Sequence, residues 1–209
     1  MMGPLILLFV GSYLLGSIPF GVLVAKSRGV DIMSVGSGNI GATNVVRVLG
    51  KGPGYLVFLL DMLKGLIPAL IARWLFPDNQ EYWFFAGMFA VIGHSLSPFL
   101  KFKGGKGIST ALGMTLGSSP VVALIALGIF LAILLGTGYV SLASIFAVVS
   151  TTPMSILFRD SLWVTIGFAA LSVFVIYRHK ANIIRLRNGT ESKFIRGKAR
   201  DKDSSDGES

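Results

Sequence analysis

The sequence predicts an all-helical polytopic membrane protein with seven transmembrane helices, and its composition and charge pattern lead to this prediction. The 209 residues are 53% apolar and only 14% charged, with a mean hydropathy of +0.72. Soluble domains carry roughly 25% charged residues, which excludes a soluble enzyme and a disordered chain. The absence of cysteine excludes a disulfide scaffold. The charges are clustered and mostly basic, 19 Lys and Arg against 10 Asp and Glu, and long uncharged stretches separate the clusters.

Four segments are each apolar and long enough for one membrane span, which needs about 20 residues. The first, residues 5–25, is uncharged. It follows no basic residue and is longer than the apolar core of a signal peptide, so we interpret it as a retained span. The other three segments are residues 55–72, 82–100 and 161–177.

A fifth stretch, residues 108–158, contains 51 residues without a charged side chain and is too long for a single crossing. Ser118-Ser119-Pro120 and Gly136-Thr137-Gly138 have helix-ending or turn chemistry and divide it. The three pieces are residues 108–117, 120–136 and 139–158. The first piece is short, about 15 Å of helix, which is half of a hydrocarbon core.

The positions of the lysines and arginines predict the orientation, because cytoplasmic loops are enriched in these residues. They cluster in the first loop, in the third loop and after the last span, whereas residues 77–81 contain two acids and no base. If the basic segments share one side, residues 108–158 cross three times, which gives seven spans. The N-terminus is then outside and the C-terminus cytoplasmic. We expect a transmembrane domain at residues 1–192 and a polar, disordered cytoplasmic tail at 193–209.

The first cytoplasmic loop is rich in glycine and short polar side chains, in the run Ser37-Gly-Asn-Ile-Gly-Ala-Thr-Asn-Val-Val-Arg47. Glycine lets backbone N–H groups point into a concavity, and an arginine donates two parallel hydrogen bonds to a phosphate. This pattern predicts an anion site, with a flexible polar loop as the alternative. The candidate residues are Ser37, Gly38, Asn39, Gly41, Thr43, Asn44 and Arg47.

The third loop, Lys101-Phe-Lys-Gly-Gly-Lys-Gly-Ile-Ser-Thr110, is a glycine-rich turn that leads directly into an apolar helix. Free N–H groups and the helix dipole favour an anion at such a helix start. The GxxxxGK spacing of nucleotide-binding loops is missing, so nucleotide binding is unsupported. The alternative is a tight basic turn between spans. The candidate residues are Gly104, Gly105, Lys106, Gly107 and Ser109.

The third basic segment follows the last span and contains Arg178, His179, Asn182 and Arg185. On a continued helix, His179 and Asn182 are three residues apart and share a face. Histidine donates to an anion or accepts a proton near neutral pH. Interfacial residues that extend toward water are the alternative. Because all three segments lie on one predicted side of the membrane, we expect them to converge on one anion site.

Three ionisable residues lie inside predicted spans, where an unpaired charge is costly. Asp61 and Lys64 are three residues apart, which predicts an ion pair on one helical face. His94 is expected to connect two helices. We assign these residues a structural role ahead of a catalytic one. Two distant histidines without a carboxylate cluster make a zinc site improbable, and the sequence indicates no metal and no cofactor.

These motifs together resemble the bacterial acyl-phosphate-dependent glycerol-3-phosphate acyltransferases, the PlsY family. The resemblance covers nearly the whole chain, to about Phe194. It rests on the run from Ser37 to Arg47, on Gly93-His94 with the glycine turn, and on the segment from Arg178 to Arg185 with Gly189 and Glu191. It implies seven spans in the bacterial inner membrane and an active site on the cytoplasmic side.

The resemblance implies transfer of a fatty acyl group from acyl phosphate to the 1-hydroxyl of sn-glycerol 3-phosphate. The products are lysophosphatidic acid and inorganic phosphate, in the first step of phospholipid synthesis. It further implies a functional link to the enzyme that makes acyl phosphate from acyl carrier protein, with no nucleic-acid partner. The glycine turn serves phosphate binding, and Glu191 supports the site. The residues on which the family depends correspond to Ser37, Arg47, Lys106, His179 and Asn182.

The candidate residues suit this chemistry because both substrates carry phosphate and phosphate is also the leaving group. Acyl phosphate is an activated anhydride, so direct transfer needs no acyl-enzyme, and positioning with charge stabilisation supplies the rate. Either His179 or a substrate phosphate accepts the hydroxyl proton, and we favour the phosphate. The competing interpretation is a small anion transporter. Transporters place their site near the midplane and often contain inverted repeats, and no repeat is visible here.

Overall fold

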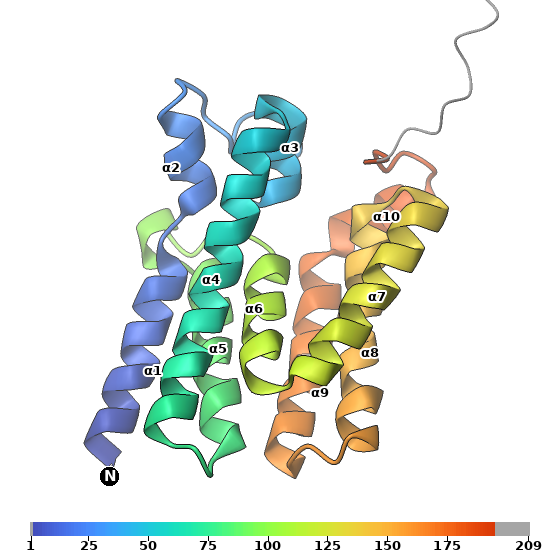
Figure 1. Cartoon of the computed structure of the whole chain (residues 1–209). Coiled ribbons are helices and arrows are strands. Elements are labelled where there is room, and N and C mark those ends of the chain that lie inside the picture. Colours follow the sequence, from blue (N-terminus) through green and yellow to red (C-terminus); the bar gives the residue numbers. More distant parts are fainter. Residues whose placement is uncertain (1, 195–209) are drawn as a thin grey trace, which may run out of the picture.

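The structure is a computed structural model that describes residues 2–194, and all the regular secondary structure in that range is helical (Figure 1). The elements are α1 (Met2–Ser17), α2 (Phe20–Lys26), α3 (Ala42–Leu49), α4 (Lys51–Leu75), α5 (Gln80–Ser95), η1 (Pro98–Leu100), α6 (Ile108–Ser118), α7 (Pro120–Thr137), α8 (Val140–Leu157), α9 (Leu162–Arg178) and α10 (Lys180–Arg187).

Five segments of the described chain are long and apolar enough to cross a membrane, which confirms the prediction of an all-helical integral membrane protein. A sixth is added if α9 and α10, which meet at a bend of 59°, are counted together. Helix α6 has only 11 residues and does not reach that length. The five segments are Met2–Lys26, Lys51–Leu75, Gln80–Leu100, Pro120–Thr137 and Val140–Leu157.

The two predicted breaks in the uncharged stretch are confirmed. Helix α6 ends at Ser118 and α7 starts at Pro120, whose missing N–H is no loss at a first helical position. Helix α7 is followed by Gly138 at φ 79°, a left-handed conformation that glycine adopts without strain. Local turn chemistry therefore sets the helix ends here.

Three features of the backbone differ from the prediction. The first predicted span is divided into α1 and α2 at Pro19, which has no N–H to continue the helical hydrogen bonds. The first loop contains the eight-residue helix α3. The last span does not continue straight, because the chain bends at His179 between α9 and α10. Two of these changes lie in segments that carry predicted site residues.

The bundle is held together by close helix contacts in which glycines are essential. A Cβ on Gly65 of α4 would lie 2.0 Å from the Thr110 carbonyl oxygen, and one on Gly113 of α6 would lie 1.9 Å from that of Met62. The short helix α6 is therefore packed backbone to backbone against α4, as Figure 1 shows. A buried cluster that includes Phe84 and Phe168 joins α5 to α9.

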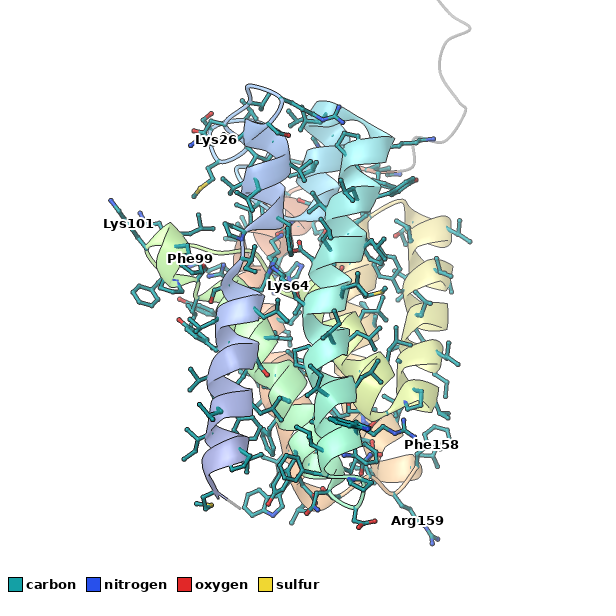
Figure 2. All side chains as sticks on the ribbon, turned by 60° about the vertical axis from the view of Figure 1, so that its left-hand side comes forward. Lys26, Lys64, Phe99, Lys101, Phe158 and Arg159 are labelled. Atoms are coloured by element: carbon teal, nitrogen blue, oxygen red, sulfur yellow. The ribbon has the colours of Figure 1, made fainter. Side chains whose placement is uncertain are left out.

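The two ends of the bundle differ in their connections. Figure 1 shows α2, α3 and α10 at one end, and short turns between α4 and α5, α6 and α7, and α8 and α9 at the other. In Figure 2, Lys26 lies at the first end, Arg159 at the second, and Lys64 inside the bundle. At the second end, Asp160 accepts hydrogen bonds from Gln80 (2.7 Å) and Ser119 (3.1 Å), which connects all three turns.

The predicted tail at residues 193–209 lies mostly outside the described residues. Its first two residues contact the bundle: the Lys193 ammonium is 5.4 Å from the centre of the Tyr139 ring, and the Phe194 N–H donates to the Gly138 carbonyl at 2.8 Å. The chain that follows α10 therefore returns to the start of α8.

Candidate active site

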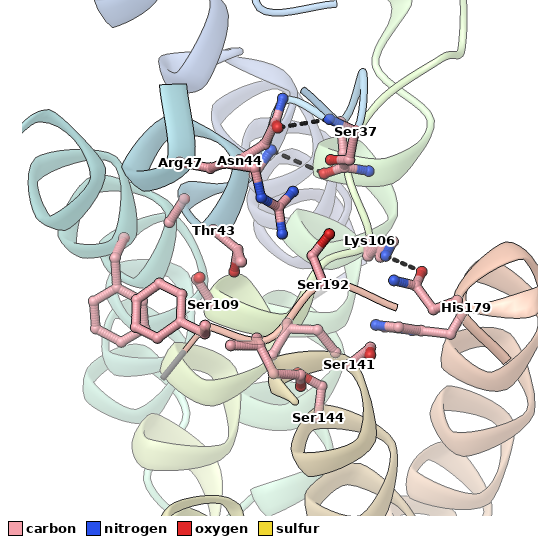
Figure 3. Close-up of a pocket in the computed structure, with 18 of the residues that line it drawn as sticks. Ser37, Thr43, Asn44, Arg47, Lys106, Ser109, Ser141, Ser144, His179 and Ser192 are labelled. Carbon is pink, nitrogen blue, oxygen red and sulfur yellow. Dashed lines mark hydrogen bonds between the residues drawn. The ribbon is translucent and has the colours of Figure 1, made fainter. Parts of the chain in front are cut away.

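A cavity of about 380 Å³ lies at the end of the bundle that contains α3 and α10 (Figure 3). Its walls come from the first loop and α3, from the residues after the glycine turn, from α8, and from the chain after α9. The three segments that the sequence predicted to converge therefore do meet. The predicted residues that line the cavity are Ser37, Asn39, Gly41, Thr43, Asn44, Arg47, Asp61, His94, Lys106, Gly107, Ser109, His179, Asn182 and Glu191.

Asn44 holds the first loop in shape from inside. Its Oδ1 accepts the Ser37 N–H at 2.8 Å (Figure 3). Its Nδ2 donates to the carbonyls of Val35 (3.1 Å) and Ile32 (3.3 Å). Only 2% of Asn44 is exposed, so its polar atoms are used within the protein. Asn44 therefore fixes the loop that presents the Ser37 side chain at the cavity.

Helix α3 brings Thr43 and Arg47 to the same wall, since residues four apart share a helical face. Asn39 helps to start this helix by accepting the Gly41 N–H at 2.9 Å through its side chain. Within residues 2–194, no hydrogen bond or ion pair engages the Arg47 guanidinium. Its donors are therefore available to a ligand, and Figure 3 shows the guanidinium directed into the cavity.

Gly104, Gly105 and Arg178 do not line the cavity, although the sequence suggested phosphate binding for them. The N–H groups of Gly104 and Gly105 donate to the carbonyls of Ser95 and His94, both at 3.1 Å. Their own carbonyls accept from Arg178 at 2.6 and 2.8 Å. Both faces of this backbone are therefore occupied, and the three residues shape the turn.

Gly38 is also absent from the cavity wall. Its N–H donates to the Val35 carbonyl at 3.0 Å, and its φ of 66° makes a turn that other residues rarely adopt. Gly38 therefore forms part of the turn behind Ser37.

Lys106 is the cation that the glycine turn delivers to the cavity, where its Nζ donates to Asn182 Oδ1 (Figure 3). Burial lowers the pKa of Lys106 to about 8. The Glu191 carboxylate opposes this shift, and the positive charges of Arg185, Arg178 and Arg47 add to it. One carboxylate thus faces several cations, and an anion bound in the cavity would complete the charge balance.

Glu191 organises the wall beside Lys106. Its carboxylate accepts from Ser141 Oγ (2.6 Å), Asn182 Nδ2 (2.6 Å) and Arg185 Nε (2.7 Å). Although burial raises the pKa of Glu191, these three hydrogen bonds outweigh it and lower the pKa below its usual value. Because Nδ2 of Asn182 is used by Glu191, its Oδ1 faces Lys106.

His179 lies at the bend between α9 and α10 and is only 2% exposed. Its Nδ1 is 2.9 Å from the Val175 carbonyl, which can only accept, so Nδ1 carries the hydrogen. In the neutral ring, Nε2 then keeps its lone pair. The bend, rather than a continued helix, brings His179 and Asn182 to the same cavity.

Several lining residues were missed by the sequence analysis. Ser141 and Ser144 are three residues apart on α8, so their shared helical face was a usable signal within an apolar span. Ser192 adds a third hydroxyl side chain. The aromatic and aliphatic part of the wall consists of Phe58, Ile108, Phe130, Val140 and Phe194. The cavity therefore has a cationic, polar part and an apolar part.

The predicted ion pair and helix connection in the bundle interior are both present. Lys64 Nζ lies 2.8 Å from Asp61 Oδ1 and 3.0 Å from His94 Nδ1, which connects α4 to α5. Asp61 and His94 reach the cavity wall, and Lys64 is behind them. Among residues 2–194, no three His, Cys, Asp or Glu side chains are grouped closely enough to hold a metal ion.

Comparisons with known proteins identify the family of this chain. The family model described as glycerol-3-phosphate acyltransferase matches residues 6–189. A glycerol-3-phosphate acyltransferase of Geotalea daltonii is 49% identical over 193 residues, covering 91% of this chain and 98% of the relative. That of Aquifex aeolicus is also 49% identical over 189 residues, covering 90% of this chain and 97% of the relative.

Two crystal structures of PlsY, an integral membrane glycerol 3-phosphate acyltransferase, have the same fold. The glycerol 3-phosphate form is 47% identical with a TM-score of 0.88, and the match covers 92% of this chain and 96% of that chain. The lysophosphatidic acid form is 46% identical with a TM-score of 0.85, over 91% and 95%. Sequence and fold therefore agree over nearly the full length of each protein, and the chain belongs to the glycerol-3-phosphate acyltransferase family.

Proposed function

We propose that this glycerol-3-phosphate acyltransferase takes its acyl group from acyl phosphate and transfers it to the 1-hydroxyl of sn-glycerol 3-phosphate. The products are 1-acylglycerol 3-phosphate (lysophosphatidic acid) and inorganic phosphate. The observation that carries the proposal is a single cavity with an excess of cations on one part of its wall and aromatic side chains on another. Family membership favours this enzyme over an anion transporter.

The cationic part of the cavity suits two phosphate groups close together. Arg47 offers a planar guanidinium, and Lys106 offers an ammonium held by Asn182. Ser37 and Thr43 add hydroxyl donors beside them. We assign the phosphates of both substrates to this group. The nearby backbone and side chains of Asn39, Gly41, Gly107 and Ser109 complete its edge.

The transfer is a direct displacement. The 1-hydroxyl oxygen attacks the acyl carbonyl carbon, an ester C–O bond forms, and the carbonyl carbon–oxygen bond to phosphate breaks with its electron pair on the phosphate oxygen. The hydroxyl proton passes to the departing phosphate. Placing the two substrates together and stabilising the developing negative charge with Lys106 and Arg47 supplies the acceleration.

His179 acts in this scheme as a hydrogen-bonding positioner for the hydroxyl. Its Nδ1–H is engaged by Val175, which leaves Nε2 to accept from the substrate hydroxyl in the bound complex, before the hydroxyl hydrogen turns to the departing phosphate. His179→Gln retains a polar group but is a far weaker base, so we expect near-normal turnover with a raised KM for glycerol 3-phosphate. Loss of turnover by about a hundredfold or more would instead identify His179 as the general base.

The donor assignment is tested with purified enzyme given glycerol 3-phosphate and either palmitoyl phosphate or a palmitoyl thioester. We expect lysophosphatidic acid and inorganic phosphate in equal amounts from palmitoyl phosphate alone. Product from the thioester alone would refute the donor. Uptake of labelled glycerol 3-phosphate into proteoliposomes without ester formation would support a transporter.

We also infer seven crossings, with the N-terminus outside and the cavity on the cytoplasmic side of the bacterial inner membrane. Helix α6 then counts as a short crossing, and the enzyme that makes acyl phosphate from acyl carrier protein supplies the donor from the same side. Single cysteines introduced at Ser34 and Asn79 of this cysteine-free chain should react with impermeant reagent from opposite sides. Reaction from one side would refute the seven-span topology.

A further inference from the structure

The interior of the bundle contains a group of ionisable side chains whose contacts extend to the glycine turn. Lys64, which is 1% exposed, donates to the Ile18 carbonyl at 2.9 Å, at the break between α1 and α2. It also contacts His94 Nδ1 at 3.0 Å and Asp61 Oδ1 at 2.8 Å, the latter as an ion pair rather than an aligned hydrogen bond. Two N–H donors of the ammonium are therefore engaged by Ile18 and His94, and its charge is paired with the Asp61 carboxylate.

These contacts also fix the ring of His94. An ammonium can only donate, so His94 Nδ1 is an acceptor and the ring cannot rotate without leaving Lys64 with one contact fewer. The opposite edge of the ring then lies directly under Gly105. A Cβ on Gly105 would come 2.1 Å from His94 Nε2, and the next two nearest atoms, at 3.0 and 3.1 Å, belong to the same ring.

The main chain of the same helix end holds the turn as well. The carbonyls of His94 and Ser95 accept the N–H groups of Gly105 and Gly104. Arg178 binds the two glycine carbonyls from the other side. The next residue along the chain is Lys106. The position of the His94 ring against Gly105 therefore affects where the Lys106 side chain enters the cavity.

We propose that Asp61, Lys64 and His94 are positioning residues for glycerol 3-phosphate, acting through Gly105 on Lys106. This inference rests on the proposed function. A buried ion pair adds little net stability compared with apolar side chains of the same volume, so folding alone is a weak reason to place one here. Contact with the turn that carries Lys106 gives the group a specific role.

The test exploits the fit between the His94 ring and Gly105. Gly105→Ala places a methyl group against the ring and displaces the turn, and we expect the KM for glycerol 3-phosphate to rise about tenfold with a small change in kcat. His94→Asn keeps an acceptor for Lys64 but removes the far edge of the ring, and we expect a rise of about threefold. In the double variant the methyl group occupies the vacated space, and KM should return to within about twofold of the original enzyme.

Gly104→Ala is the matched control. Its Cβ would lie 2.0 Å from the His94 carbonyl oxygen, a backbone atom that His94→Asn does not remove. His94→Asn should therefore rescue Gly105→Ala and not Gly104→Ala. Thermal unfolding of each purified variant separates a moved turn from a poorly folded protein. His94→Ser, which also removes the ring, gives the same comparison if His94→Asn does not fold.

A double variant no better than Gly105→Ala would overturn the proposal, because the ring would then not set the position of the turn. Equal rescue of Gly104→Ala would also overturn it, since the effect would be a general loosening. These outcomes are distinct from failure of the proposed function, which the unsubstituted enzyme reveals with palmitoyl phosphate and glycerol 3-phosphate.

Discussion

The two ends of the helical bundle join their helices in different ways. At the cavity end, Pro19 interrupts the first span, the glycine turn replaces regular helix, and the chain bends at His179. At the other end, neighbouring helices are joined by short turns, and Asp160 connects Gln80 to Ser119.

The difference shows where irregular backbone is tolerated in a membrane protein. Unpaired N–H and carbonyl groups are costly in hydrocarbon and are tolerated where protein or a water-accessible cavity satisfies them. The carbonyls of Ile18, Gly104 and Gly105 each have a cationic side chain as partner, Lys64 or Arg178. The irregular segments at the cavity end thus form one polar framework beside the cavity, whereas the opposite end has only to join helices.

The largest expected effect comes from removing the Lys106 ammonium from the cavity. Lys106→Ala should lower kcat/KM for glycerol 3-phosphate about a hundredfold or more, since losing one partner of a desolvated charged contact costs roughly 2–5 kcal/mol. The midpoint of thermal unfolding should change little, because Lys106 faces the cavity rather than the core. Initial rates against glycerol 3-phosphate concentration measure the effect.

Arg159→Ala is the matched control at the opposite end, where the side chain is exposed. It removes the same charge from the molecule and should leave kcat/KM within about twofold. Equal losses in the two variants would mean that overall charge, rather than the framework around the cavity, governs anion use.

Some of the helix ends and breaks could be predicted from the sequence, and others could not. Ser119-Pro120 and Gly138 mark helix ends by their own chemistry, so the breaks at both positions were predictable. Pro19 was overlooked because the apolar run around it satisfies the length of a span. Helix α3 was hidden in a loop of polar composition, although its Val45 packs into a buried cluster.

The role of Gly104 and Gly105 could not be predicted from the sequence. Sequence shows that Gly104 and Gly105 free the backbone to turn, but not whether their N–H groups face a ligand or another segment. Both donate to the end of α5, and it is the residues that follow them, from Lys106 onward, that line the cavity. The contact between the His94 ring and Gly105 joins residues from two segments whose distance in space no local pattern encodes.

A smaller effect is expected from pH, and it belongs to the cavity end alone. The pKa of Lys106 is about 8, lowered mainly by burial, so the ammonium is lost as pH rises through that value. Because we assign phosphate binding to the protonated form, kcat/KM should fall with a slope approaching tenfold per pH unit above about pH 8.

Lys106→Arg provides the comparison for the pH profile, since arginine stays protonated throughout this range. Its kcat/KM will be lower, and its alkaline decline should disappear. A decline that persists unchanged in Lys106→Arg would assign the titration to another group. Substituting Asp160 at the opposite end should not move the profile.

The smallest effect on catalysis is expected from Asp160→Asn at the opposite end. The amide oxygen still accepts from Gln80, and the amide nitrogen can donate to the Ser119 hydroxyl, so two hydrogen bonds to a charged acceptor are replaced by weaker neutral ones. The cost should be about 1–2 kcal/mol of unfolding free energy, read as a lower midpoint of thermal unfolding in detergent. The KM for glycerol 3-phosphate should stay the same, because the short turns at that end are linked to the cavity only through rigid helices. A raised KM in Asp160→Asn, at a temperature where the protein is fully folded, would show that the two ends are coupled and that the phosphate site depends on the whole bundle.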